Sequence, residues 1–414
     1  MTTSRPKNTL AAAPSPTRRI SIFAAALLSI ALSTPVLVRS IPKQFAGATL
    51  TAHEWGTFTS VAGAEGKAIE WFASRTSDLP AFVEHYAGAY GKAGLIGTIR
   101  METPVIYFYA PRETTVSVHV SFAKGLITEW YPHASNVSPT NPPPSNQPVR
   151  LLPLPFDGSI AWNSVVLSPN TTPNFPHESA PSRYYAARST SAIPVSVRTS
   201  FGNQHEKFLF YRGVSDASIP IAATILADGH VQLENLVTDS VPALILFERC
   251  GDNISYRIVE PLPDHATLET PAFTGNLDSL HSDFEKILIS QGLYLDEARA
   301  MLETWRDSWF EEGSRLFYIV PRSFVDSILP LSIDPAPAQL TRVFVGRLEL
   351  LSPRTQSSIE SALSSHDWQT LQKYGRFLEP FAKLIIAKQS DPNYVARLRQ
   401  DLDTFYDSPS TQAR

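Results

Sequence analysis

Apolar and polar residues alternate along much of the chain between residues 49 and 272, and this alternation predicts half-buried β-strands. Residues 116–121 read VSVHVS, so three valines share one face of the expected strand and three polar residues share the other. Short apolar runs at 207–214, 219–237 and 243–261 are divided by turn residues, and Asp228-Gly229 is typical of a hairpin turn. Short strands joined by turns predict an antiparallel β-sandwich over residues 49–272.

The pattern changes to helical spacing beyond residue 273. Residues 278–291 and 295–312 carry apolar side chains three or four positions apart, and a glycine follows each segment. Two strand-like runs come next, RLFYIVP and RVFVGRLELL, and Ser352-Pro353 then indicates a helix start with proline at the first helical position. The sequence therefore predicts an α+β fold, in which the antiparallel β-sandwich is followed by a smaller helix-rich mixed unit over residues 273–406 and a disordered tail over residues 407–414.

A proline-dense segment near residues 132–155 interrupts the strand pattern. It contains the run Pro142-Pro143-Pro144. Proline cannot donate to a sheet and breaks a helix, so this segment is neither a central strand nor a helix. We interpret it as an insertion on the surface of the sandwich that serves as a connection, with a binding arm as the alternative.

The first 48 residues have the pattern of an export signal. Basic residues at positions 5, 7, 18 and 19 precede the apolar run Ile20–Val38, and the first acidic residue of the chain is Glu54. A basic head followed by an apolar stretch is typical of a secretory signal peptide, and the run is also long enough for an uncleaved membrane anchor. Either reading leaves the rest of the chain outside the cytoplasm, in the periplasm, the cell envelope or the medium, with membrane contact only through this segment.

Composition narrows the function classes further. The chain has 414 residues, of which 18% are charged, and a formal net charge of −4 at pH 7. Nucleic-acid binding calls for a basic patch or stripe, so no nucleic-acid partner is expected. The single Cys250 excludes an internal disulfide and every zinc motif built on cysteines.

The doublet His53-Glu54 is the first candidate for chemistry. A zinc protease helix needs a second histidine four residues after the first, and that position is Thr57. Neighbouring residues on a strand face opposite ways, so the two side chains cannot serve one metal from one strand. Histidines from separate strands remain the alternative, but we predict no metal and no cofactor. The chain also lacks the G-x-S-x-G, dinucleotide-binding and P-loop motifs.

Carboxylates and tryptophans define the two function classes that stay open. A hydrolase of the glycosidase type needs two carboxylates flanking the scissile bond, and the candidates are Glu54, Glu102 and Glu129, with Glu303 and Glu311 as further choices. A binding protein needs exposed aromatic faces that stack on sugar rings, and the candidates are Trp55, Trp130 and Trp162, with Trp71 as a further choice. Trp305 and Trp309, one helical turn apart, are expected to pack in the core.

Six segments together resemble an uncharacterised family of exported bacterial proteins. They read HEWGTFTS, METPVIYFY, LITEWYP, FYRG, WRDSWFEEGSRLFYIVPR and RVFVGRLELLSP, and they are spread over most of the chain beyond the signal. The resemblance implies export and carries no activity. We therefore expect an extracytoplasmic protein that binds a glycan, such as a polysaccharide, or an envelope protein without catalysis. The alternative is a carboxylate-dependent hydrolase acting on polysaccharide.

Overall fold

The structure is a computed structural model that describes residues 49–72, 78–86, 95–139 and 157–408. The expected export segment, most of the proline-dense insertion and most of the expected tail lie outside these residues. Residues 45–414 form one compact unit. Its fold is α+β, as predicted, with mostly antiparallel sheets in the N-terminal part and helices at the C-terminal end.

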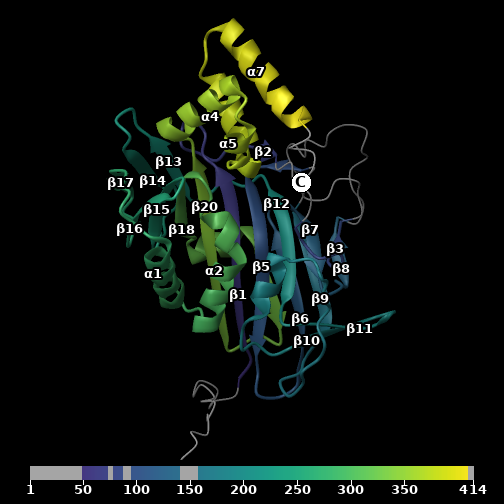
Figure 1. The fold of residues 1–414 in the computed structure, drawn as a ribbon. Coiled ribbons are helices and arrows are strands. Elements are labelled where there is room, and N and C mark those ends of the chain that lie inside the picture. The colour runs from purple at the N-terminus through teal and green to yellow at the C-terminus, as the bar shows by residue number, and fades with distance from the viewer. Residues whose placement is uncertain (1–48, 73–77, 87–94, 140–156, 409–414) are drawn as a thin grey trace, which may run out of the picture. The chain divides into compact units, whose positions relative to one another are not determined.

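The central element is a nine-stranded sheet (Figure 1). All of its neighbouring strands pair antiparallel except β1 and β20, which are parallel. In spatial order the strands are β16 (Asn253–Val259), β15 (Leu244–Cys250), β18 (Gly313–Ile319), β20 (Gln339–Leu350), β1 (Thr51–Val61), β5 (Ile99–Tyr109), β12 (Leu209–Ser215), β7 (Gly125–Tyr131) and β3 (Glu84–His85).

A six-stranded sheet shares one hydrophobic core with the central sheet. Alternation places the valines at 116, 118 and 120 in that core, as predicted, together with Phe58 and Ile106 of the central sheet. This packing of two sheets around one core is the arrangement of a β-sandwich. The six strands are β11 (Gly202–Glu206), β10 (Val195–Thr199), β9 (Gly158–Leu167), β6 (Thr114–Phe122) and β19 (Leu331–Asp334), with β8 (Asn136–Ser138) paired to β9.

Two small sheets and the helices complete the unit. The small sheets are β13 (Ile221–Ile225), β14 (Val231–Asn235) and β17 (His265–Leu268), and β2 (Trp71–Phe72) with β4 (Ile96–Gly97). The helices are η3 (Arg183–Arg188), α1 (Leu277–Ser290), α2 (Leu295–Trp309), α3 (Arg322–Ile328), α4 (Pro353–Ser365), α5 (Trp368–Gln372), η4 (Gly375–Phe377), α6 (Leu378–Ala387) and α7 (Pro392–Asp407).

Helices α1 and α2 cover the second face of the central sheet (Figure 1). A second hydrophobic cluster joins these helices to Trp55 of β1 and Phe317 of β18. As expected, Trp305 and Trp309 are core residues, and their rings stack with centroids 6.1 Å apart. Glu297 caps the start of α2, because its carboxylate accepts the Tyr294 backbone N–H at 2.7 Å.

The C-terminal helices α4 to α7 have a core of their own. It includes Val61 at the end of β1, Trp71 of β2 and Phe381 of α6. Helix α4 begins as predicted, with Pro353 in its first turn and the Ser352 hydroxyl accepting the Thr355 backbone N–H at 3.2 Å. A helix-rich region therefore exists near the C-terminus, and it packs on the end of β1.

The unit boundary that the sequence suggested at residues 272/273 does not divide the described structure. Strands β18 and β20 come after this boundary, yet they lie between β15 and β1 in the central sheet. Their sequence runs were correctly identified as strands, but partners far apart in the chain cannot be read from periodicity. The sandwich and the helix-rich region consequently share one sheet.

A fragment of residues 49–272 should not fold as a domain. Without β18 and β20, strands β1 and β15 each lose a hydrogen-bonded neighbour at the centre of the sheet, which leaves buried backbone groups unpaired. We expect thermal unfolding of this fragment, followed by circular dichroism, to show no cooperative transition, whereas the full chain shows one. A sharp transition in the fragment would mean that the two predicted units fold separately.

Candidate functional site

The doublet His53-Glu54 is split between the two faces of the central sheet, as strand geometry requires. Both side chains are fully buried. The His53 ring nitrogen Nδ1 lies 2.8 Å from Oε2 of Glu297, on the face that α2 covers. Tyr109 donates its hydroxyl to the other oxygen of Glu297 at 2.8 Å. His53 therefore anchors α2 to the sheet.

Glu54 lies in the core between the two sheets, paired with an arginine. Arg342 donates its Nε–H to Oε2 of Glu54, and Tyr211 donates its hydroxyl to Oε1 at 2.5 Å. Burial lowers the pKa of Arg342 and the Glu54 carboxylate raises it, and the net result is a pKa above the ordinary value. Both oxygens of Glu54 are engaged by donors, so this carboxylate acts as a buried counter-ion.

Glu102 points to the opposite face from Glu54. It lies opposite Thr57 in the register of β1 and β5, beyond a bulge at Thr103, whose φ is 53°. Thr59 donates its hydroxyl to Glu102 at 2.8 Å, and Arg376 of η4 binds both carboxylate oxygens through its two Nη atoms. Because Glu54 and Glu102 are on opposite faces, the structure does not bring them together as a catalytic pair.

Glu129 shares the face of Glu102 and lies opposite Arg212 in the pairing of β7 with β12. Arg212 in turn donates to Asp78 at 2.7 Å. Burial lowers the pKa of Arg212, but the carboxylates of Asp78, Glu129 and Glu102 raise it above the ordinary value. The three predicted carboxylates are thus each placed beside an arginine, and Glu102 and Glu129 belong to one larger set.

That set is a line of charged side chains that crosses the central sheet on the face covered by α2. Arg315 lies opposite Glu349 and donates to it at 2.9 Å, and Arg347 also donates to Glu349. Both arginines also bind the end of α2, because Arg347 donates to the Ser308 carbonyl and Arg315 to the Trp309 carbonyl. We call this set the central charged row, and it comprises Arg315, Glu349, Arg347, Arg100, Glu102, Arg376, Arg212, Glu129 and Asp78.

The strands of the row, together with β1, are those that carry the resemblance to exported proteins. The six resembling segments lie in β1, β5, β7, β12, the end of α2 with β18, and β20, and these strands are consecutive neighbours in the sheet. The further candidates also have arginine partners, since Glu311 contacts Arg347 at 3.3 Å and Glu303 contacts Arg306 at 3.2 Å. Ion pairs within the protein explain the positions of these carboxylates, so no ligand is needed to account for them.

The tryptophans predicted to bind a ligand are buried instead. Trp55 and Trp162 have no exposed surface and Trp130 is 9% exposed. The ring N–H of Trp162 donates to the Pro132 carbonyl at 2.8 Å, and that of Trp130 donates to Glu84 at 2.9 Å. None of the three presents a flat face to solvent, so the aromatic platform expected from them is not formed. Composition identified large aromatic side chains but could not show which way they point.

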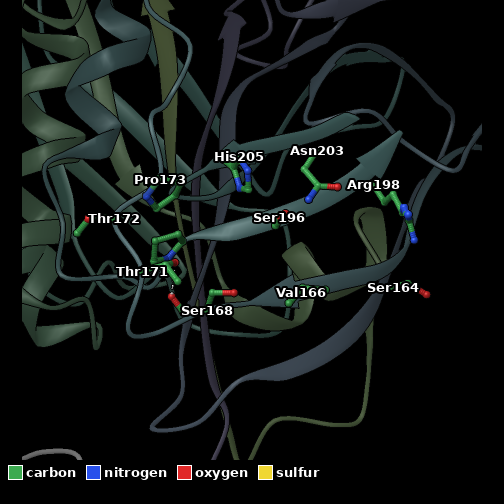
Figure 2. A pocket seen from close by; sticks show the side chains of 11 residues that line it. Ser164, Val166, Ser168, Thr171, Thr172, Pro173, Ser196, Arg198, Asn203 and His205 are labelled. Carbon is green, nitrogen blue, oxygen red and sulfur yellow. Dashed lines mark hydrogen bonds between the residues drawn. The ribbon is translucent and has the colours of Figure 1, made fainter. Parts of the chain in front are cut away.

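An open pocket of about 580 Å³ lies on the six-stranded sheet, at the edge formed by β9, β10 and β11 (Figure 2). Its floor consists of alternate residues of these strands, while Val165, Leu167, Val195 and Val197 between them point into the core. The loop after β9 forms one wall. The lining residues are Ser164, Val166, Ser168, Thr171, Thr172, Pro173, Pro194, Ser196, Arg198, Asn203 and His205.

The polar groups of this pocket are available to a ligand. Within the described residues, no hydrogen bond or ion pair engages the side chains of Ser164, Ser196, Arg198, Asn203 or His205. The register places Arg198 opposite Asn203 and Ser196 opposite His205. Sequence reasoning missed this site. The alternation of Val195 and Val197 with Ser196 and Arg198 predicts that one face of this strand is exposed to solvent. It does not predict that the exposed faces of β9, β10 and β11 together form a pocket.

Comparison of the chain with models of known protein families and with curated protein sequences finds no match in either. The resemblance to exported bacterial proteins therefore stays a prediction. In the described part of the chain, no group of three or more His, Cys, Asp or Glu side chains is arranged to hold a metal ion. No helix there is long and apolar enough to cross a membrane.

Replacing Glu102 by glutamine should destabilise the protein by about 3–5 kcal/mol, because it removes the buried carboxylate that binds Arg376 through both oxygens and leaves that largely buried arginine without its paired charge. The measurement is urea unfolding followed by fluorescence. The control is Glu303→Gln, which breaks the exposed contact with Arg306 and should cost less than about 1 kcal/mol. Equal losses in the two variants would show that the row does not depend on its ion pairs.

Proposed function

We propose that this chain is an exported protein that binds a glycan, without catalysis, in the pocket on strands β9, β10 and β11. The observation that carries the proposal is a pocket of about 580 Å³ in which five polar side chains have no partner within the described residues, namely Ser164, Ser196, Arg198, Asn203 and His205. Pockets for small ligands are commonly about 300–1,000 Å³. This size suits one or two sugar rings.

The chemistry of the lining matches a polyhydroxylated ligand. Each sugar hydroxyl both donates and accepts a hydrogen bond, and serine, threonine and asparagine side chains do the same. Side chains on such a floor are about 4.8 Å apart across strands and about 6.7 Å apart along a strand, so several can reach one ring. Pro173, Pro194 and Val166 add apolar surface for the C–H faces of the sugar.

A glycan fits this pocket better than a protein partner does. Protein interfaces are enriched in aromatic residues and methionine and depleted in serine. The described lining holds no aromatic residue other than His205 and holds three serines, Ser164, Ser168 and Ser196. The hairpin turn between β10 and β11 carries Phe201, which is fully exposed. A longer glycan on this hairpin would find an aromatic face there.

Binding is favoured over hydrolysis by the placement of the carboxylates. Glycoside hydrolysis uses two carboxyl groups about 5–10 Å apart on either side of the bond. The described lining contains no Asp or Glu, and the candidates Glu54 and Glu102 are held by Arg342 and Arg376 on opposite faces of the other sheet. The described lining of the pocket therefore offers neither of the two carboxylates that hydrolysis of a bound sugar would need.

The glycan proposal predicts that the full chain is retarded in native gels containing a soluble polysaccharide. The probes are dextran, xylan and polygalacturonate. Asn203→Ala combined with His205→Ala should weaken binding by about fivefold or more, since each hydrogen bond contributes about 0.5–1.5 kcal/mol. His119→Ala on β6 of the same sheet lies outside the lining and should bind like the wild type. Loss of binding in both variants, or in neither, would contradict the proposed site.

Export is the part of the proposal that rests on the sequence. Its support is the basic head, the apolar run Ile20–Val38 and the lack of any acidic residue before Glu54. A fusion of residues 1–60 to alkaline phosphatase, which is active only outside the cytoplasm, should be active in bacterial cells. Replacing the basic residues Arg18 and Arg19 by glutamate should reduce that activity. An inactive fusion that is present in full amount would refute export.

A further inference from the structure

Arg198 differs from the arginines of the central charged row in having no counter-ion among the described residues. In the row, each buried arginine lies beside at least one carboxylate, as Arg315 does with Glu349 and Arg376 with Glu102. Arg198 is exposed at the edge of the pocket, and no Asp or Glu is among the described lining residues. The pocket therefore carries a positive charge that nothing in the described protein neutralises.

The setting of Arg198 is suited to a planar anion. A guanidinium presents two parallel N–H groups, which match the two oxygens of a carboxylate. Asn203 lies opposite Arg198 in the strand register, and Figure 2 shows the two side chains next to each other at one end of the pocket. The Asn203 amide can then bind the ring oxygen of the sugar, which is bonded to the carbon that bears the carboxylate, or the hydroxyl on the next carbon. The serine and threonine hydroxyls extend from there along the floor.

The charge is local to the pocket. The chain as a whole has a formal net charge of −4, so Arg198 does not belong to a generally basic protein that attracts any polyanion. One guanidinium balances one negative charge. This count matches one uronic-acid residue, which carries a single carboxylate.

We propose that the glycan recognised by this pocket is acidic, and that Arg198 binds the carboxylate of a uronic-acid residue while Asn203 and His205 bind its neighbouring hydroxyls. The inference rests on the proposed glycan binding and specifies its ligand class. A carboxylate and a sulfate ester are both anionic groups of glycans. The carboxylate is the better match because it is planar, and its two oxygens can accept the two parallel N–H groups of the guanidinium fork in one plane, whereas a sulfate ester is tetrahedral.

The test compares three oligosaccharides of equal length by titration calorimetry with the full chain. They are oligogalacturonate, the same oligomer with its carboxyl groups reduced to alcohols, and a sulfated neutral oligomer. We expect oligogalacturonate to bind about ten- to a hundredfold more tightly than the reduced oligomer, which corresponds to one charge-assisted hydrogen-bonded pair. The sulfated oligomer should bind more weakly than oligogalacturonate.

Substitutions assign the preference to one side chain. Arg198→Gln should abolish the difference between the acidic and reduced oligomers, because it removes the guanidinium that binds the carboxylate. Arg198→Lys, which keeps the charge but loses the fork, should retain only part of the difference. Arg399→Gln on α7 removes an exposed arginine far along the chain from the pocket residues and should have no effect.

The outcomes separate this inference from the function on which it rests. Equal affinity of the wild type for the acidic and reduced oligomers would overturn the acidic ligand and leave glycan binding in place. Tighter binding of the sulfated oligomer would also overturn the carboxylate assignment. An Arg399→Gln variant that loses the preference as Arg198→Gln does would show a general charge effect. Binding of none of the three oligomers would refute the proposed function itself.

Discussion

Charge buried in the middle of the central sheet is the constraint on which the rest of the structure depends. An arginine or glutamate taken out of water is tolerated only with a partner and hydrogen bonds, so each charge in the row requires a neighbour at a defined place. Arg315 and Arg347 thereby fix where α2 ends, and Glu102 fixes η4 through Arg376. Such pairs add little net stability compared with apolar packing. Their effect is to make alternative registers and helix positions unfavourable.

Local order was predictable from the sequence, and long-range pairing was not. The valines at 116–120, the stacked Trp305 and Trp309, and the start of α4 at Ser352 follow from alternation, helical spacing and capping, which involve residues close together in the chain. The insertion of β18 and β20 between β15 and β1 depends on contacts between distant segments. No periodicity records such contacts, so the sequence suggested two units where the central sheet in fact takes strands from both.

The candidate site shows the same division. Strand alternation correctly separates His53 from Glu54, because adjacent residues on a strand must face opposite ways. It could not show that Glu54 meets Arg342, or that Trp162 turns inward to donate to the Pro132 carbonyl. Arg198 had no motif to mark it. Arg198 stands out because no carboxylate lies in the described lining of the pocket, and only the three-dimensional structure shows which residues surround it.

The parallel pairing of β1 with β20 has a consequence for how the protein is made. Strand β1 leaves the ribosome long before its neighbour β20, which pairs with it from Thr51↔Gln339 onward. Closing so long a loop is slow, and one edge of β1 stays open until then. The nascent chain therefore cannot complete its main sheet before β20 is synthesised. That delay suits the proposed export, because a chain that has not yet folded can still be threaded through a narrow membrane channel.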